Sequence, residues 1–291
     1  MMSIPRPLAA LFMTALLCAT PVHAQANLDG VTVRLTKSSG SVYMAEGVGG
    51  FGGGNVAASI GSDGVLLVDD MYEGMVPKLQ QAIAGVSPLP IRIVINTHFH
   101  GDHIQGNNVL GKTAVIIGQE NVLKRVSLGK SAGLYPMVTF TNEMTIRFNG
   151  ENIRVLHLPN GHTDGDAIVF FETSKVLHLG DMYFVGMFPA VYREGGGDIK
   201  QLITSLDRVL AEFPADAKVI PGHGDMTTMK DLAAYVTMLK ETVAAAENGI
   251  REKKTPAAMQ QDPAFTKYAK LGTGGAQTLE QYVAMLVKLL Q

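Results

Sequence analysis

Residues 96–103, NTHFHGDH, concentrate side chains that can bind metal, because three histidines and one aspartate lie between His98 and His103. The preceding apolar run, IRIVIN, predicts a short strand at 91–96. A loop at the end of a strand can turn several side chains inward together. So short a segment cannot easily place all four on one ion. The spacing therefore suggests two neighbouring ions, with His98 and His100 on one and Asp102 and His103 on the other.

Three later segments would complete such a pair of sites. They contain His162 in PNGHTDGD, Asp181 at the end of KVLHLGD, and His223 in IPGHGD. Each lies in a glycine-flanked turn at the end of a predicted strand, where functional residues commonly gather, and glycine lets the backbone approach closely. Imidazole nitrogen and carboxylate oxygen are ligands that suit zinc, and a catalytic zinc keeps one position open for water.

The rest of the chain alternates strand and helix patterns. Strands are predicted at 31–36, 41–47, 64–70, 91–96, 114–118, 145–149, 151–159, 166–172, 175–181 and 218–222. Helices are predicted at 74–86, 107–112, 119–126, 199–213, 229–252 and 278–290, with Thr278 as a cap of the last one. Strands come in two batches, each followed by helices, which predicts two sheets packed on each other inside a helical coat.

A glycine-rich segment, EGVGGFGGGN, occupies residues 46–55. It contains G-x-G-x-x-G at Gly47, Gly49 and Gly52, but it leads into another strand instead of a helix, and no Gly-Lys-Ser/Thr follows. We therefore predict a mobile hairpin and not a phosphate-binding loop.

The first 24 residues have the pattern of an export signal. Arg6 precedes an apolar run from about Leu8 to Ala19. A Val-His-Ala triplet that ends at Ala24 then fits a signal-peptidase cleavage site. A retained anchor is the alternative, but no later stretch reaches the roughly 18 apolar residues of a membrane span. We expect a periplasmic protein with one mature domain, residues 25–291, and no membrane contact after cleavage. Cys18, the only cysteine, would be removed, so neither disulfides nor thiolate ligands are expected.

The net charge of −2 provides no basic surface for nucleic acid. A small-molecule substrate is the expected partner. A domain of residues 25–291 is large enough to form a core that needs no metal for its stability, which favours a functional metal over a structural one.

The ordered set His-x-His-x-Asp-His, Gly-His-Thr, Gly-Asp and Pro-Gly-His-Gly resembles the metallo-β-lactamase superfamily of αββα sandwich hydrolases. The resemblance runs from about Val31 to the 220s and implies an α/β fold with four layers, αββα. It implies that His98, His100 and His162 hold a first zinc ion. Asp102, His103 and His223 would hold a second, with Asp181 bridging the two. Asp69, in LLVDD, matches the acidic residue that the family has at a strand end.

The resemblance further implies a hydrolase in which two zinc ions share a hydroxide that attacks a carbonyl carbon, with Asp102 as the catalytic residue that orients it. A β-lactam or lactone is the expected substrate class. Two departures separate this chain from the cysteine-containing β-lactamases: Asp181 stands at the position of their zinc-binding cysteine, and Phe184 at that of a lysine that binds the substrate carboxylate. A thioesterase similar to glyoxalase II is the main alternative, and an iron-dependent persulfide dioxygenase the other.

Further residues of these segments are candidates for a role at the site. Phe51, at the tip of the glycine-rich hairpin, Phe184, and Arg193, as a replacement for the missing lysine, are candidate substrate-binding residues. His157 and His178 lie within predicted strands, match no ligand of the family and are assigned to structure. Three acidic residues flank the motifs and are candidates for orienting a ligand imidazole: Asp164, Asp166 and Asp225.

Overall fold

The computed structural model describes residues 28–128 and 135–291. The expected export signal at 1–24, with Cys18, lies outside these residues. Within them, no helix has the length and apolar character that crossing a membrane requires.

The first sheet has seven strands in the described part of the chain, and strands that are neighbours in the sheet are also consecutive in sequence. They are β1 (Thr32–Ser39), β2 (Val42–Val48), β3 (Val56–Gly61), β4 (Gly64–Val68), β5 (Ile91–Ile95), β6 (Val115–Gln119) and β7 (Val138–Phe140). β1 to β4 pair antiparallel and β4 to β7 pair parallel. Every residue of the central β4 is buried, because helices or the second sheet cover both faces of this parallel region.

The second sheet has six strands among the described residues, in the spatial order β13-β12-β11-β10-β9-β8. They are β8 (Glu143–Phe148), β9 (Glu151–His157), β10 (Ala167–Phe171), β11 (Val176–His178), β12 (Lys218–Ile220) and β13 (Thr227–Thr228). Their pairing is antiparallel except between β11 and β12, which are joined by a helical crossover.

The helices of the described segments differ widely in length. They are α1 (Val76–Ala84), α2 (Gly101–Ile104), α3 (Asn107–Leu110), α4 (Glu120–Leu128), α5 (Ile199–Glu212), α6 (Met229–Arg251), α7 (Pro256–Met259), α8 (Pro263–Thr266) and α9 (Leu279–Leu290). Thr278 caps α9 as predicted, since its hydroxyl accepts the N–H of Gln281 while the Gln281 side chain accepts the N–H of Thr278.

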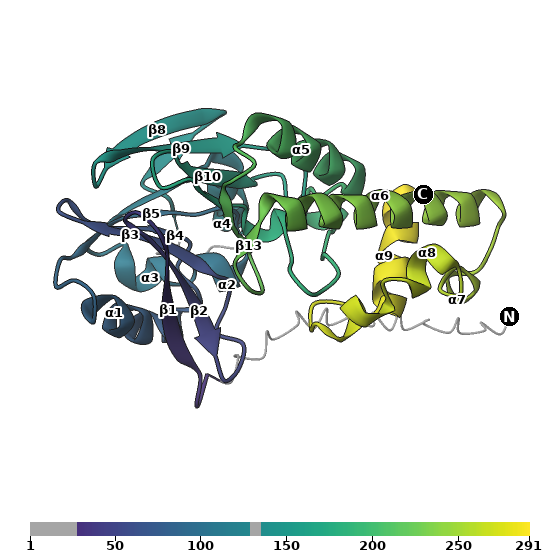
Figure 1. Cartoon of the computed structure of the whole chain (residues 1–291), viewed down its shortest axis with the longest axis horizontal. Coiled ribbons are helices and arrows are strands. Elements are labelled where there is room, and N and C mark those ends of the chain that lie inside the picture. The colour runs from purple at the N-terminus through teal and green to yellow at the C-terminus, as the bar shows by residue number, and fades with distance from the viewer. Residues whose placement is uncertain (1–27, 129–134) are drawn as a thin grey trace, which may run out of the picture.

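Three apolar layers hold these elements together. Side chains of both sheets, such as Leu66 and Phe171, form the core between them. α1 covers the outer face of the first sheet with Leu79, and α5 and α6 cover the outer face of the second with Leu206 and Leu239. Figure 1 shows the two sheets with α1 and α3 on one side and α5 and α6 on the other. The predicted four-layer αββα sandwich is confirmed.

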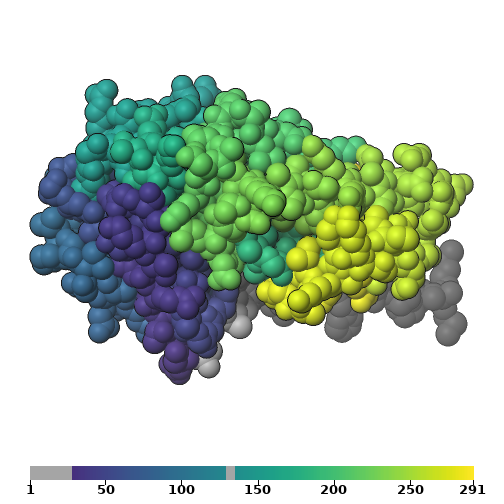
Figure 2. All heavy atoms as spheres, in the orientation of Figure 1, coloured from purple at the N-terminus to yellow at the C-terminus, as the bar shows by residue number. Residues whose placement is uncertain are grey.

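The C-terminal helices extend the layer that covers the second sheet. Tyr282 of α9 stacks on Phe188 at a ring-centroid distance of 4.2 Å, and its hydroxyl lies 2.8 Å from the hydroxyl of Thr242 in α6. In Figure 2 this segment, in yellow, adjoins the green surface of α6. The segment therefore packs against the loop after β11 as well as against α6.

Several short elements were not predicted. β3 has the sequence VAASIG, whose small residues give little strand preference of their own, and its place between β2 and β4 makes it a strand. β7, β13, α7 and α8 have between two and four residues each. Such lengths are too short for a periodic pattern to be recognised.

Candidate metal centre and its cavity

The segment NTHFHGDH begins at the carboxyl end of β5. The backbone N–H and the hydroxyl of Thr97 both donate to the Asp69 carboxylate, at 2.7 and 2.8 Å. This contact fastens the start of the loop to the end of β4. His98 is buried at that point, while His100 is followed by the single turn of α2, which carries Asp102 and His103.

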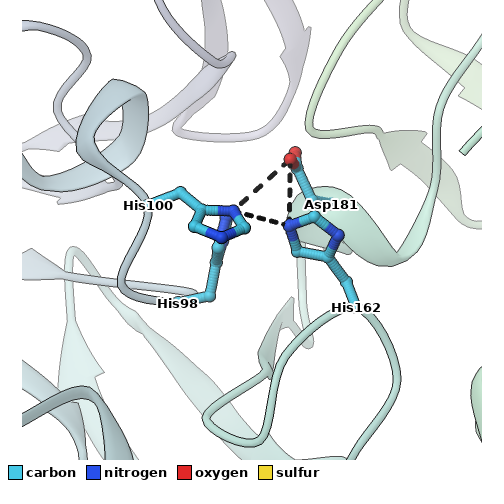
Figure 3. A group of neighbouring side chains, drawn as sticks. All are labelled: His98, His100, His162 and Asp181. Atoms are coloured by element: carbon cyan, nitrogen blue, oxygen red, sulfur yellow. Dashed lines mark hydrogen bonds and ion pairs between the residues drawn. The ribbon is translucent and has the colours of Figure 1, made fainter. Parts of the chain in front are cut away.

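A first group of side chains consists of His98, His100, His162 and Asp181, whose potential ligand atoms all lie within 4.8 Å of one another. His162 Nε2 lies 2.8 Å from His100 Nδ1 and 3.4 Å from Asp181 Oδ2. His98 Nε2 lies 3.8 Å from the same carboxylate oxygen. Figure 3 shows the four side chains pointing toward one another from separate segments. We call them the first set.

A second group consists of Asp102, His103 and His223, again with potential ligand atoms within 4.8 Å of one another. The Nε2 atoms of His103 and His223 are 3.4 Å apart, and Asp102 Oδ2 lies 3.6 Å from the former and 3.4 Å from the latter. We call this group the second set.

Asp181 lies between the two sets. Its Oδ2 faces His98 and His162, whereas its Oδ1 lies 3.1 Å from His103 Nε2 and 3.2 Å from His223 Nε2. One carboxylate thus presents a different oxygen to each set, as a ligand shared by two ions would do.

Contacts on the far side of the imidazole rings orient these histidines. The second ring nitrogen of a metal-binding histidine commonly donates to a carboxylate or carbonyl, which sets the tautomer. His103 Nδ1 lies 2.7 Å from Asp69 Oδ2, and His162 Nδ1 lies 2.5 Å from the carbonyl of Ala190. Both rings therefore direct Nε2 into the site.

The polypeptide packs closely around the second set. A Cβ added at Gly54 would collide with the imidazole ring of His103, and one added at Gly222 would collide with Asp181. Glycine at these two positions allows the backbone to approach the ligands.

Burial and charge affect the two sets differently. Burial lowers the pKa of His98 well below its usual value and that of His100 to about 3, so both rings are neutral and able to coordinate. Burial also lowers the pKa of His223, but the carboxylates of Asp181 and Asp102 outweigh it and raise this pKa to about 9. In the second set, a metal ion must therefore displace a proton.

One buried polar atom of the site, His98 Nε2, has no hydrogen-bond partner in the described structure. Unpaired polar atoms are unfavourable in a protein interior, and coordination to a metal would satisfy this nitrogen. Nitrogen and oxygen ligands of this kind suit zinc. The residues present therefore fit a pair of metal ions.

An open cavity of about 720 Å³ gives access to both sets. Its floor includes His100, Asp102, His162, Asp181 and His223. Its walls come from the glycine-rich segment, from the loop after β11 and from residues 274–276. A substrate in this cavity would contact all four ligand-bearing segments.

The family model of the metallo-beta-lactamase superfamily matches residues 49–223, more than half of the chain. The chain belongs to the metallo-β-lactamase superfamily. The matched residues include all seven side chains of the two sets.

Two curated relatives carry different activities in their names. Metallo-beta-lactamase type 2 of Bacteroides fragilis is 30% identical over 132 residues, 45% of this chain and 52% of that protein. A hydroxyacylglutathione hydrolase of Methylococcus capsulatus is 31% identical over 132 residues, 45% of this chain and 47% of that protein. The chain thus aligns with about half the length of these relatives.

The fold agrees with solved structures of the superfamily. The DIM-1 metallo-beta-lactamase superposes with a TM-score of 0.63 and 20% identity, covering 72% of this chain and 98% of that one. A metallo-beta-lactamase from Pontibacter korlensis superposes with a TM-score of 0.60 and 19% identity, covering 72% of this chain and 99% of that one.

The three candidate substrate-binding residues of this superfamily member are placed differently. Phe51 is half-exposed at the cavity wall, with its ring centroid 5.5 Å from that of His223, and Phe184 is buried beneath the cavity and stacks on His223 at 5.4 Å. Arg193 does not line this cavity. Its guanidinium donates to the carbonyl of Leu289 at 2.7 Å and is therefore held away from the metal sets.

The three acidic residues that flank the motifs form no hydrogen bond with a ligand imidazole within the described part of the chain. Asp166 accepts hydrogen bonds from the backbone N–H groups of His162 and Thr163, so it holds the turn and not the imidazole. Asp164 forms a two-oxygen ion pair with Arg125. Asp225 is exposed at the cavity wall.

The remaining histidines bind backbone atoms. His157 Nδ1 lies 2.8 Å from the Asp166 carbonyl, and His178 Nε2 lies 3.1 Å from the Asn55 carbonyl. Both have the structural role that was predicted.

Sequence reasoning missed Thr97, the Ala190 carbonyl and Asn55 around the site. Thr97 immediately precedes His98, so its place in the motif was a usable signal. The other two act through backbone contacts with residues far away in sequence, for which the sequence carries no local sign.

Proposed function

We propose that this superfamily member is a dinuclear zinc hydrolase that opens the ring of a cyclic amide or lactone, β-lactams included. The observation that carries the proposal is the Asp181 carboxylate, which presents Oδ2 to the first set and Oδ1 to the second. When bound, two such ions supply a nucleophile at neutral pH by lowering the pKa of water and polarise a carbonyl oxygen.

Asp102 is the proposed catalytic residue. It lies on the cavity floor, with its Oδ2 3.4 Å from His223 Nε2. Burial raises the pKa of Asp102, but the neighbouring His103 and His223 outweigh this effect and lower it. Asp102 therefore remains a carboxylate at neutral pH, able to orient an attacking water and to accept its proton.

The cavity walls support an uncharged, apolar substituent next to the reacting carbonyl. Phe51, Phe184, Met187 and Tyr192 contribute aromatic and thioether surface, and none of the described residues that line the cavity is a lysine or arginine. A substrate carboxylate would therefore have to rely on the metal ions for its counter-charge.

A thioesterase is the second candidate. It is supported by the relatives named hydroxyacylglutathione hydrolase, of which the one from Methylococcus capsulatus is 31% identical over its aligned part. Ring opening is preferred because S-lactoylglutathione carries two carboxylates, a β-lactam carries one and a simple lactone none, and the cavity offers no basic side chain among the described residues.

Metal analysis and a substrate panel test the proposal. We expect two zinc ions per chain and turnover of a lactone and a chromogenic cephalosporin that a chelator abolishes and zinc restores. Turnover of S-lactoylglutathione alone would replace ring opening by the thioesterase. One iron ion per chain would reject a dinuclear zinc enzyme, and His157→Gln, outside both sets, serves as the control for metal content.

Export to the periplasm forms part of the same proposal and is supported by the pattern of residues 1–24. Expression in a Gram-negative host with fractionation and N-terminal sequencing tests it. Recovery of the uncleaved chain in the cytoplasm would contradict it.

A further inference from the structure

Asn55, at the end of the glycine-rich segment, lies at the junction of the segments that carry the second set and Asp181. It is 5% exposed and directly precedes β3. Its side-chain amide donates to the carbonyls of Pro221 and Gly224, at 3.0 and 2.8 Å. Its backbone N–H donates to the carbonyl of Gly222 at 2.8 Å. One residue thus binds three of the four carbonyls in the turn around His223.

The carbonyl of Asn55 extends this contact to the turn of Asp181. It accepts a hydrogen bond from His178 Nε2 at 3.1 Å, and His178 Nδ1 in turn accepts the N–H of Gly180 at 3.1 Å. These two partners require the neutral tautomer protonated at Nε2, and burial favours it because it lowers the pKa of His178. Asn55 is therefore linked through one imidazole to the residue that precedes Asp181.

The preceding residue completes the arrangement. The N–H of Gly54 donates to the carbonyl of Asp102 at 2.9 Å, and the ring of His103 packs directly against Gly54. The dipeptide Gly54–Asn55 consequently contacts the segments of Asp102, His103, Asp181 and His223. Among the contacts of the described residues, the dipeptide is linked to the first set only through the turn of the shared Asp181.

We propose that Asn55 is a positioning residue for the metal ion of the second set. It holds the turn of His223 directly, and the turn of Asp181 through His178, against the end of the glycine-rich segment. The inference rests on the proposed metal occupancy of the second set. Because Phe51 belongs to the same glycine-rich segment, Asn55 also connects this part of the cavity wall to the second set.

Asn55→Asp tests the proposal, since it keeps the shape of the side chain but replaces the amide nitrogen, which carries both N–H donors, by one oxygen that faces the two carbonyls. Asn149→Asp is the matched control. Asn149 also donates its amide to two oxygens, those of Ser59 and the Gly64 carbonyl, but it lies in the turn between β8 and β9. Asn55→Ala removes the donors without adding charge and serves if the aspartate variant does not fold.

Two measurements are needed. In zinc titrations against a chromophoric chelator, the binding constant of the second set is identified as the one that His223→Gln removes. We expect it to fall about 10–100-fold in the Asn55 variants, and that of the first set to change less, because only the shared Asp181 connects it to Asn55. In amide hydrogen exchange, with zinc and after chelation, we expect faster exchange at residues 179–185 and 221–226 and no change at 145–157.

The possible results separate this proposal from the proposed function. Unchanged exchange at 221–226, or equal weakening of both binding constants, would overturn the role of Asn55. Accelerated exchange throughout the chain would also overturn it, because it would indicate a general loss of stability. Wild-type protein that binds fewer than two zinc ions would reject the dinuclear enzyme, and the exchange of the chelated protein would still decide whether Asn55 holds the two turns.

Discussion

The Asp69 carboxylate lies 2.7 Å from His103 Nδ1, and both side chains are fully buried. The same carboxylate oxygen accepts the hydroxyl proton of Thr97, whose oxygen lies 3.0 Å from His98 Nδ1. One carboxylate at the end of β4 therefore orients one imidazole of each set, directly in the second set and through a hydroxyl in the first.

Asp69→Asn should weaken the binding of both metal ions. The NH2 group of asparagine would face N–H or O–H donors where the carboxylate now accepts from His103 and Thr97, so at least one of these hydrogen bonds would be lost. Changes of this kind typically reduce metal affinity about 10–100-fold. Asparagine tolerates the positive φ of 64° at this position, so the fold should persist. Zinc titration with circular dichroism as a check on folding measures the effect.

Asp216→Asn is the control for that experiment, since it removes an exposed ion pair with Lys175 far from the metal sets. Its zinc affinity should equal that of the wild type. Wild-type affinity in Asp69→Asn would show that the contact to His103 does not orient the ring.

Asp102→Asn should preserve the fold and reduce turnover by at least about 100-fold. An amide at this position cannot accept a proton, and a positioned acid or base commonly contributes about 10²–10⁴-fold. Turnover of the best cyclic substrate, measured with saturating zinc and with metal content determined in parallel, separates a catalytic loss from a loss of metal. Full activity of the variant would remove Asp102 from the mechanism.

The metal-free protein should lose stability as the pH rises from 6.5 to 9. The folded-state pKa of His223 is raised from 6.5 to about 9. Over this range the folded state holds a proton that the unfolded state has released, so the stabilisation present below pH 6.5 disappears as pH rises through 9. The melting temperature of chelator-treated protein should accordingly decrease across this interval.

Zinc affinity should rise as the pH rises from 6.5 to 9, because the ion competes with the proton on His223. Titrations in chelator-buffered zinc at several pH values test this expectation. His223→Gln should reduce the pH dependence of the melting temperature. Part of it should remain, because burial lowers the pKa of His103 but the carboxylates of Asp181, Asp102 and Asp69 raise it well above its usual value. A variant with the slope of the wild type would contradict the assignment to His223.

Phe51→Ala should raise KM for an apolar cyclic substrate with little change in kcat. The ring is 53% exposed and lies against the rings of Tyr72 and His223 at the cavity wall. Its loss removes apolar contact that binds ground state and transition state alike. Val86→Ala, at an exposed position after α1, is the control and should leave KM unchanged. An equal loss in kcat would place Phe51 in the chemical step.

Local patterns in the sequence were sufficient for much of this protein. The capping pattern around Thr278, the buried run of β4 and the glycine-flanked ligand motifs at strand ends each depend on neighbours a few residues away. The superfamily and its sandwich fold followed from the order of those motifs, and the family match and the two packed sheets confirm them.

Contacts between distant residues were decided only by the tertiary structure. The sequence determined which seven side chains could serve as ligands, but not that the two oxygens of Asp181 would face different sets. Arg193 likewise seemed free to bind substrate until α9 presented the Leu289 carbonyl to its guanidinium. Asn55 and Pro221 are 166 residues apart. A buried side chain forms hydrogen bonds with the backbone groups that packing places within about 3 Å of it. No periodic pattern in the sequence shows which groups these are.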